Sequence, residues 1–319
     1  MKFSLVIPLA PDRTAPIIES IKKINYPKTE FHVVVVRGKN PSANRNKGAE
    51  NAKGEIIGFL DDDAIVDENI LKNTDEFFEK HPEVDIVGGP QLTPKDETGF
   101  AKISGYALGS KFGAWKLASR YGGYKEECNA DECNLTSANL FVRKKVLDRV
   151  KFDTQLFPGE DPKFIDDSRK AGFIVSFSPS IIVYHKRRKN AGGLIKQIFS
   201  YGKTRPMKES FFKTIKNPFF LIPSIFLVYV LFILGRVLYS PRITGGVIDL
   251  TNSINNGSWI IYPLIFYIIL CLVFGIHDSI KNKDYKSILI LPFIYPLIHL
   301  SYGAGMIYGY IGKINSGST

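Results

Sequence analysis

Three apolar stretches near the C-terminus constrain the fold of this chain more than any other feature. They cover residues 219–239, 259–276 and 288–311 of 319. A helix rises about 1.5 Å per residue, so about 20 apolar residues cross the hydrocarbon core of a bilayer. A soluble domain that buried three such helices as its core would have little polar sequence left to cover them. We therefore predict an all-α transmembrane region of three helices within residues 218–319, the third kinked or re-entrant at its prolines.

A basic segment precedes the first apolar stretch. Residues 185–216 contain ten Lys and Arg side chains against one acid, Glu209. Basic segments beside a span stay in the cytoplasm and bind anionic lipids, which we prefer to nucleic acid as the partner here. Within residues 191–217, apolar side chains recur at helical spacing, which predicts a juxtamembrane helix lying in the membrane interface. The alternative is that these apolar side chains pack on the preceding domain.

Charge also predicts the location of the first 190 residues. The loop over residues 240–258 is poor in charge, whereas residues 278–286 carry three lysines, as a cytoplasmic loop would. The apolar N-terminus ends at Pro8, too soon for a secretory signal. We expect a multi-pass protein of the cell membrane whose residues 1–190 are cytosolic, with Cys128 and Cys133 as reduced thiols.

Residues 1–190 alternate strand and helix patterns. Strands are predicted at residues 5–9, 32–36, 54–60 and 84–89, and helices at 15–23, 43–52 and 68–81, the second helix opened by Ser42. This alternation predicts an α/β domain with a mainly parallel sheet. Ligands of such sheets bind beyond the carboxyl ends of the strands.

Three consecutive acids end the third predicted strand at that place. Along an extended chain Asp61 and Asp63 point to one side and Asp62 to the other. Carboxylates so close repel each other unless a cation intervenes, and oxygen ligands suit Mg²⁺ or Mn²⁺ bridged to a phosphate. The alternative is a solvated acidic turn, or a cap for the next helix.

Two longer blocks surround these acids with a recognisable pattern. Residues 42–71 read SANRNKGAENAKGEIIGFLDDDAIVDENIL, and residues 135–173 read LTSANLFVRKKVLDRVKFDTQLFPGEDPKFIDDSRKAGF. The first resembles the nucleotide-sugar segment, and the second the acceptor segment, of inverting family 2 glycosyltransferases with a GT-A fold. The resemblance covers roughly residues 2–190. It implies a cytosolic, Rossmann-like GT-A catalytic domain over residues 1–190, ahead of the basic segment and the transmembrane region.

The resemblance also implies residue roles. Asp63 is the expected direct metal ligand, with Asp61 and Asp62 nearer the sugar or ribose, and Asp61 a second candidate ligand. Asp161 matches the general base, and Glu160 lies beside it; the alternative for Asp161 is a helix N-cap. Pro8 and Ala10 fall on the first nucleotide-binding loop, Arg45 lies beside the nucleotide, and Arg205 is a candidate for the diphosphate. His185 is a candidate third metal ligand or diphosphate contact; the alternative is a surface residue.

The sequence departs from the family pattern in two places. The second strand is followed by Arg37 and Gly38 instead of the usual acidic pair that contacts the base, which leaves the nucleobase open. The Gln-x-x-Arg-Trp motif of processive polysaccharide synthases is replaced by QIFSYGKTR at residues 197–205. Arg205 in that stretch has the planar fork that suits phosphate, but it is equally compatible with a lipid-facing role.

The expected function is transfer of a sugar from a UDP- or GDP-linked donor to a lipid-linked acceptor, with Mg²⁺ or Mn²⁺ as cofactor. The acceptor would be a polyprenyl or dolichyl phosphate, or its glycan, at the cytoplasmic membrane face. The alternatives are a polysaccharide synthase, a non-catalytic membrane scaffold with a nucleotide-sensing domain, and a sugar-1-phosphate nucleotidyltransferase. The last expects a glycine-rich phosphate loop where this chain has PLAPDRTAP. The sugar and the oligomeric state stay open.

Overall fold

The computed structural model describes residues 1–209, 211–238 and 258–315. The chain divides into two compact units, Met1–Asn190 and Ala191–Thr319, which we call the α/β unit and the helical unit. Most of the predicted charge-poor loop, residues 240–257, lies outside the described residues, as does the last residue of the first predicted span.

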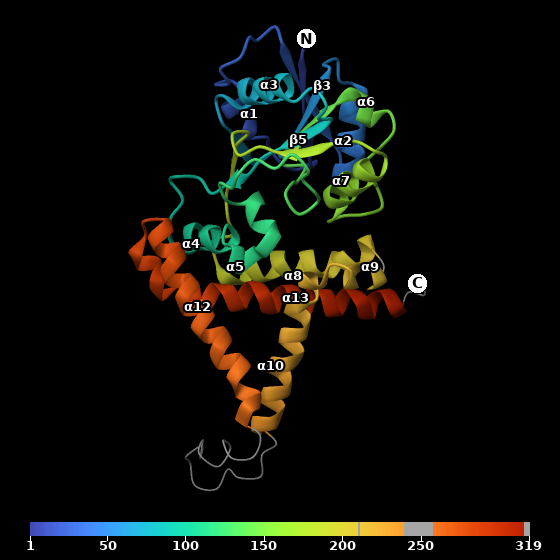
Figure 1. Ribbon diagram of the computed structural model, residues 1–319. Coiled ribbons are helices and arrows are strands. Elements are labelled where there is room, and N and C mark those ends of the chain that lie inside the picture. Colours follow the sequence, from blue (N-terminus) through green and yellow to red (C-terminus); the bar gives the residue numbers. More distant parts are fainter. Residues whose placement is uncertain (210, 239–257, 316–319) are drawn as a thin grey trace. The chain divides into compact units, whose positions relative to one another are not determined.

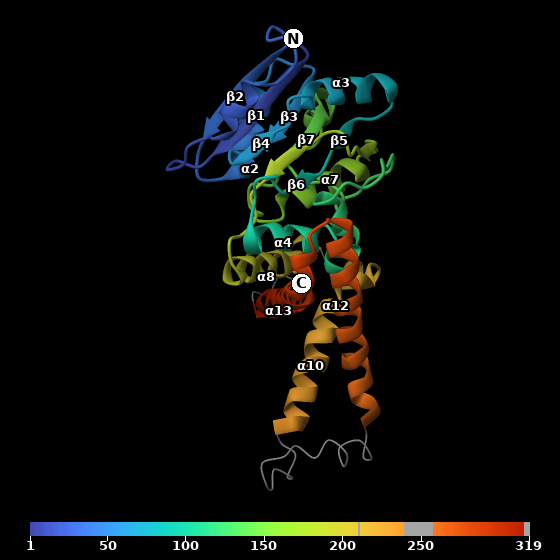
Figure 2. The same ribbon diagram turned by 90° about the vertical axis from the view of Figure 1, so that its left-hand side faces the viewer.

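The centre of the α/β unit is a six-stranded sheet with the order β2-β1-β3-β7-β5-β8, seen in Figures 1 and 2. Within residues 1–190, which are all described, only β7 runs against the other strands of this sheet, because it pairs antiparallel with both β3 and β5. The sheet is therefore mixed, with the predicted parallel arrangement interrupted at one strand. Its strands are β1 (Phe3–Leu9), β2 (Phe31–Arg37), β3 (Ile56–Leu60), β5 (Ile86–Gly88), β7 (Asn139–Arg143) and β8 (Val175–Phe177).

Burial on both faces explains why the central strands are continuous apolar runs. Along β1, Leu5 and Ile7 belong to one hydrophobic core and Val6 to another, since successive side chains of a strand point to opposite faces. Helices cover these faces. Residues of α1 (Ile17–Ile21) and α3 (Ile70–Lys80) belong to the first core, and residues of α2 (Pro41–Glu50), α6 (Lys144–Leu147) and α7 (Glu160–Lys170) to the second. The unit also contains α4 (Gly99–Leu108), α5 (Lys111–Ala114) and a 3-10 turn at Trp115–Arg120, which belong to neither core.

The start of α2 differs from the prediction by two residues. Asn40, rather than Ser42, caps the helix, because its side-chain oxygen accepts a hydrogen bond from the Ala43 N–H at 3.0 Å. Pro41 then takes the first helical position, where a missing N–H costs nothing.

A second, three-stranded sheet matters more for the site. It has the order β4-β9-β6, with β4 (Ala64–Val66), β9 (Val183–His185) and β6 (Gln91–Leu92). In the antiparallel β4–β9 pair, Ala64 lies opposite His185. This pairing brings His185 next to the three acids that precede β4.

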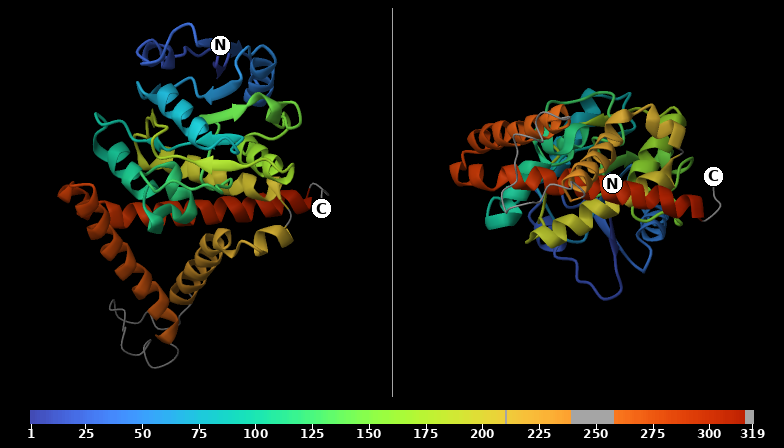
Figure 3. Two further views of the ribbon diagram at one scale, coloured as in Figure 1. Left: turned by 45° about the horizontal axis from the view of Figure 1, so that its top comes forward. Right: turned by 90° about the horizontal axis from the view of Figure 1, so that it is seen from below.

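In the helical unit, α8 and α13 lie side by side, and α10 and α12 run at a steep angle to them (Figure 3). A Cβ atom on Gly202 would lie 2.2 Å from the Tyr302 carbonyl oxygen, and one on Gly305 would lie 2.1 Å from the Phe199 carbonyl oxygen. Glycine therefore lets the two backbones approach closely. The helices are α8 (Ala191–Lys208), α9 (Phe211–Ile215), α10 (Ile222–Leu238), α12 (Tyr262–Lys281) and α13 (Leu291–Asn315), with 3-10 turns at Pro218–Phe220, Ser258–Ile261 and Tyr285–Leu289.

Two stretches of the described residues, Pro218–Arg236 and Trp259–Lys281, are long and apolar enough to cross a membrane. Only 6% and 11% of their apolar windows are buried, unlike the core helices of a soluble domain. The third predicted span is not among them. Its residues form most of α13, which continues through Pro296 as one helix and buries Tyr295, Ile298 and Met306.

Candidate active site

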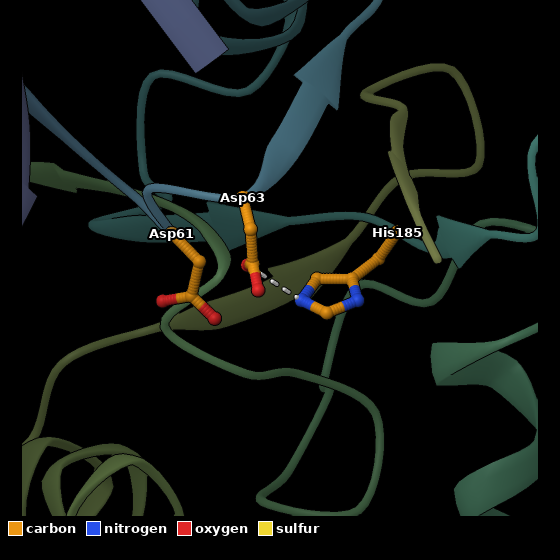
Figure 4. A group of neighbouring side chains, drawn as sticks. All are labelled: Asp61, Asp63 and His185. Carbon is orange, nitrogen blue, oxygen red and sulfur yellow. Dashed lines mark ion pairs between the residues drawn. The ribbon is translucent and has the colours of Figure 1, made fainter. Parts of the chain in front are cut away.

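The three acids that follow β3 have different neighbours. Ligand atoms of Asp61, Asp63 and His185 all lie within 4.8 Å of one another, and Figure 4 shows these three side chains gathered together. Asp62 instead lies buried beside Arg13, with its Oδ2 atom 3.2 Å from the Arg13 Nε atom. Asp62 and Asp63 lie in a turn, in which the Ala64 N–H donates to the Asp61 carbonyl oxygen at 3.2 Å, so the expectation of an extended chain here was wrong.

His185 and Asp63 form an ion pair, with 3.1 Å between Nε2 and Oδ1. The hydrogen bond from His185 is the main reason that the pKa of Asp63 is well below its usual range; burial opposes it and Arg13 adds to it. Burial lowers the pKa of His185, but Asp63 and Asp61 outweigh burial and raise it overall. Asp63 and His185 therefore stabilise each other's charged form.

Arg13 is a site residue that the sequence analysis missed. Its NH2 group donates a hydrogen bond to Asp63 Oδ2 at 2.7 Å. Burial raises the pKa of Asp62, and the nearby Arg13 guanidinium opposes this rise. The available signal was a lone basic residue in the loop PLAPDRTAP that follows the first strand.

Arg37 supports the loop that carries Arg13. Its NH1 group donates to the carbonyl oxygens of Ala10, at 3.2 Å, and Arg13, at 3.1 Å, and also to that of Pro11. Ala10 therefore begins the loop as expected. Pro8 does not lie on it, because it is the penultimate residue of β1. A proline fits there because the pairing of β1 with β3 ends at Val6, so no partner on that side needs its missing N–H.

Arg45 connects the two predicted motif blocks. It extends from α2, is buried, and donates from NH2 to Asp61 Oδ1 at 3.1 Å and from NH1 to Glu160 Oε1 at 2.9 Å. Its guanidinium also lies over the Phe152 ring, 5.5 Å from the centroid. A single buried cation thus joins the acids after β3 to the acids that begin α7.

The acids at the start of α7 differ in environment. Gly159, with φ at 114°, caps the helix in a left-handed conformation that favours glycine. Burial, together with the Asp161 carboxylate, raises the pKa of Glu160 to about 7. Asp161 lies within the first turn and is not the N-cap; its Oδ2 atom accepts a hydrogen bond from the Ser137 N–H at 3.4 Å.

Arg205 has partners of its own in the helical unit. It is buried, donates from Nε to Glu209 Oε1 at 2.9 Å, and lies over the Phe220 ring with 3.5 Å to the centroid. Its contact with a nucleotide diphosphate stays a prediction.

The residues present fit a divalent cation. Two carboxylates and one imidazole, with no thiolate among them, are a donor set suited to a hard or borderline metal such as Mn²⁺ or Mg²⁺. Among the residues that the structure describes, this is the one group of acids and histidines with such spacing.

The motif blocks and this geometry have counterparts in known proteins. Residues 10–150 match the model of the family described as Glycosyl transferase family 2. Residues 10–150 form a family 2 glycosyltransferase domain. The predicted family and enzyme class are thereby confirmed. A curated relative, the minor teichoic acid biosynthesis protein GgaB of Bacillus subtilis (strain 168), is 28% identical over 158 residues, which are 49% of this chain and 16% of GgaB.

One solved structure supports the fold assignment. The mannosyltransferase PcManGT from Pyrobaculum calidifontis, in complex with GDP-Man and Mn²⁺, aligns over 98% of this chain and 88% of its own at 13% identity and a TM-score of 0.59. Residues 1–349 of TarS from S. aureus align over 100% of this chain and 92% of theirs at 15% identity and a TM-score of 0.44. The GT-A-like assignment rests on the first of these, and at this identity the likeness concerns the fold alone.

Proposed function

We propose that this chain is a membrane-anchored, metal-dependent inverting glycosyltransferase. It moves a sugar from a UDP- or GDP-linked donor to a lipid-linked acceptor at the cytoplasmic membrane face. The observation that carries the proposal is the continuous set of contacts from Asp61 through Arg45 to Glu160, because it joins a metal-type acid cluster to a second pair of acids. Donor and acceptor groups of an inverting transferase need this proximity.

Asp61, Asp63 and His185 would hold Mg²⁺ or Mn²⁺ on the donor side. Such a cation would stabilise the negative charge that develops on the departing diphosphate. The fold neighbour PcManGT was solved with GDP-Man and Mn²⁺, which supports a nucleotide-sugar and a divalent metal here. Arg45 keeps Asp61 oriented toward this site because its guanidinium is held at both ends by carboxylates.

Asp161 would act on the acceptor side. An acceptor hydroxyl oxygen attacks the anomeric carbon on the face opposite the diphosphate, and its proton passes to the Asp161 carboxylate. The bond from the anomeric carbon to the diphosphate oxygen breaks, and its electron pair leaves with the diphosphate. A phosphate acceptor is already anionic, so Asp161 would then have little proton to remove. The Ser137 N–H orients this carboxylate.

The apolar helices and the basic segment support a lipid-linked acceptor. Two helices of sufficient length expose most of their apolar side chains, and ten basic residues precede them. Anionic lipid headgroups would bind such a segment. The name of the relative GgaB links it to teichoic acid synthesis, which favours a cell-envelope polymer or its lipid-linked precursor as acceptor. Because the match spans 16% of GgaB, its own substrates are only a guide.

The test uses membranes that contain either the wild type or Asp63→Ala. They are incubated with labelled UDP- and GDP-sugars and Mn²⁺ or Mg²⁺, and lipids are then extracted. We expect a metal-dependent labelled lipid from the wild type alone. Equal labelling by both proteins would contradict the metal mechanism. Transfer to a soluble acceptor would contradict only the lipid-linked acceptor, and a product that lengthens with time would favour a polysaccharide synthase.

A further inference from the structure

The metal site contains a cation supplied by the chain itself. Arg13 donates from NH2 to Asp63 at 2.7 Å, and its Nε atom lies 3.2 Å from Asp62. One guanidinium therefore pairs with two of the three consecutive carboxylates, and Arg45 pairs with the third, Asp61. Carboxylates this close would otherwise repel each other.

Arg13 and Arg45 differ in how firmly they are held. The Arg45 side chain is 5% exposed and paired at both ends, whereas that of Arg13 is 50% exposed. An exposed arginine with one direct hydrogen bond to a carboxylate can leave that carboxylate at little cost. Arg45 thus keeps its carboxylate partners, whereas Arg13 can exchange its partner.

The backbone beneath Arg13 is held in place. Arg37 donates to the carbonyl oxygens of Ala10 and Arg13 and also to that of Pro11. The loop follows β1, at the carboxyl end of a strand where α/β sheets bind their ligands. The Arg13 side chain can therefore change partner while its backbone stays beside the site.

We propose that Arg13 is a counter-ion that changes partner, from the Asp63 carboxylate to the phosphates of the donor, when a divalent metal and the donor bind. In the absence of a divalent cation, Arg13 pairs with Asp63 and so competes with the metal for this carboxylate. When a metal and a nucleotide diphosphate bind together, Arg13 leaves Asp63 and pairs with the phosphates, whose oxygens match its planar fork. Metal and nucleotide then favour each other's binding, because each removes the cost of displacing Arg13. This inference rests on the proposed metal site and makes Arg13 a donor-binding residue.

The experiment measures Mn²⁺ binding to the full-length protein in detergent from the electron paramagnetic resonance signal of unbound Mn²⁺. The proteins compared are the wild type, Arg13→Gln and Arg13→Lys. The matched control is Arg169→Gln, since the Arg169 side chain donates a hydrogen bond to Asn129 and lies in the last turn of α7, away from the acids that begin this helix. Each titration is done with Mn²⁺ alone and again with UDP or GDP.

We expect Arg13→Gln to bind Mn²⁺ about fivefold more tightly than the wild type when no nucleotide is present. Added UDP or GDP should increase the Mn²⁺ affinity of the wild type more than that of Arg13→Gln. Arg13→Lys should fall between the two, because an ammonium keeps the charge without the fork. Arg169→Gln should behave as the wild type.

Equal or weaker Mn²⁺ binding by both Arg13 variants in the absence of nucleotide would overturn the inference, as would a failure of every protein to bind Mn²⁺. If Arg13→Gln does not show the cooperative thermal unfolding of the control, the Mn²⁺ affinity of Arg13→Lys alone tests the inference. Because these titrations involve no sugar transfer, they separate the two proposals. Tighter Mn²⁺ binding by Arg13→Gln without any transferase activity of the wild type would support the inference and contradict the proposed function. Metal-dependent transfer by the wild type with unchanged Mn²⁺ affinity in the Arg13 variants would support the proposed function and contradict the inference.

Discussion

Arg45 is the residue through which the two halves of the site depend on each other. Its side chain is buried between Asp61 and Glu160, where an unpaired charge would be costly. The residue types and their order indicated Asp61 and Asp63, and the family resemblance indicated Glu160 and His185. The sequence could not place Arg13 in the site, because the loop that positions this side chain depends on contacts with Arg37, 24 residues away.

The proposed chemistry predicts that substitutions at Asp63 and Asp161 lower kcat by different amounts. Asp63→Asn should lower kcat at least about 100-fold for any acceptor, because the metal site loses a charged ligand. Asp161→Asn should lower kcat by about 100-fold or more for a hydroxyl acceptor and by less than about tenfold for a phosphate acceptor. Steady-state rates with both acceptor types provide the measurement. A larger loss at Asp161 than at Asp63 with a phosphate acceptor would contradict the assignment of roles.

Glu160 predicts a pH dependence of stability. Its pKa is raised to about 7 in the folded chain from an ordinary value of 4.5, so between these values the folded state binds more protons than the unfolded state. The free energy of unfolding therefore falls as pH rises through this window. Between pH 5 and pH 8 the Tm of the wild type should fall by about 3 °C more than that of Glu160→Gln. Parallel declines in a thermal-shift assay would show that this carboxyl is ionised across the window.

At the level of elements, apolar runs located the central strands well because both faces of the sheet are buried. They carried no information on direction, so the antiparallel β7 was not expected. The β4–β9 pair joins residues 64–66 to 183–185, and local pattern cannot reveal a partner so distant. The proximity of His185 to the acids was suggested by family resemblance and not by spacing.

The α8–α13 contact predicts a position-dependent effect of adding one methyl group. Gly305→Ala places a Cβ atom 2.1 Å from the Phe199 carbonyl oxygen, so the helices must separate, at a cost of about 1–3 kcal/mol. Gly312→Ala is the control, because no atom lies within 4 Å of its added Cβ and alanine favours the helix. Thermal unfolding in detergent should show a lower Tm for Gly305→Ala only. Equal Tm values would mean that the two helices do not pack this closely.

For the whole molecule, hydropathy alone predicted three membrane spans, and two helices meet the criteria of length and composition. The third stretch, most of α13, is not among them; its glycines and buried side chains allow close packing against α8.

Membrane anchoring predicts how the chain is extracted. If α10 and α12 cross the bilayer, the chain should stay with membranes through both high salt and alkaline carbonate. A variant with Arg188→Gln and Lys189→Gln should also stay with the membranes, because the two spans hold the chain even when these headgroup contacts are lost. Immunoblots of pellet and supernatant give the measurement. Release of the wild type by carbonate would contradict the two spans.

The central claim is that Asp61, Asp63 and His185 hold a divalent ion against the diphosphate of a sugar donor. Crystals or frozen particles of the chain with Mn²⁺ and UDP or GDP test it most directly, through the position of the metal. We predict Mn²⁺ bound by the Asp63 carboxylate and touching the diphosphate, with Arg45 still between Asp61 and Glu160. Bound nucleotide with Mn²⁺ elsewhere, or with Asp63 still paired only to Arg13 and His185, would contradict the account.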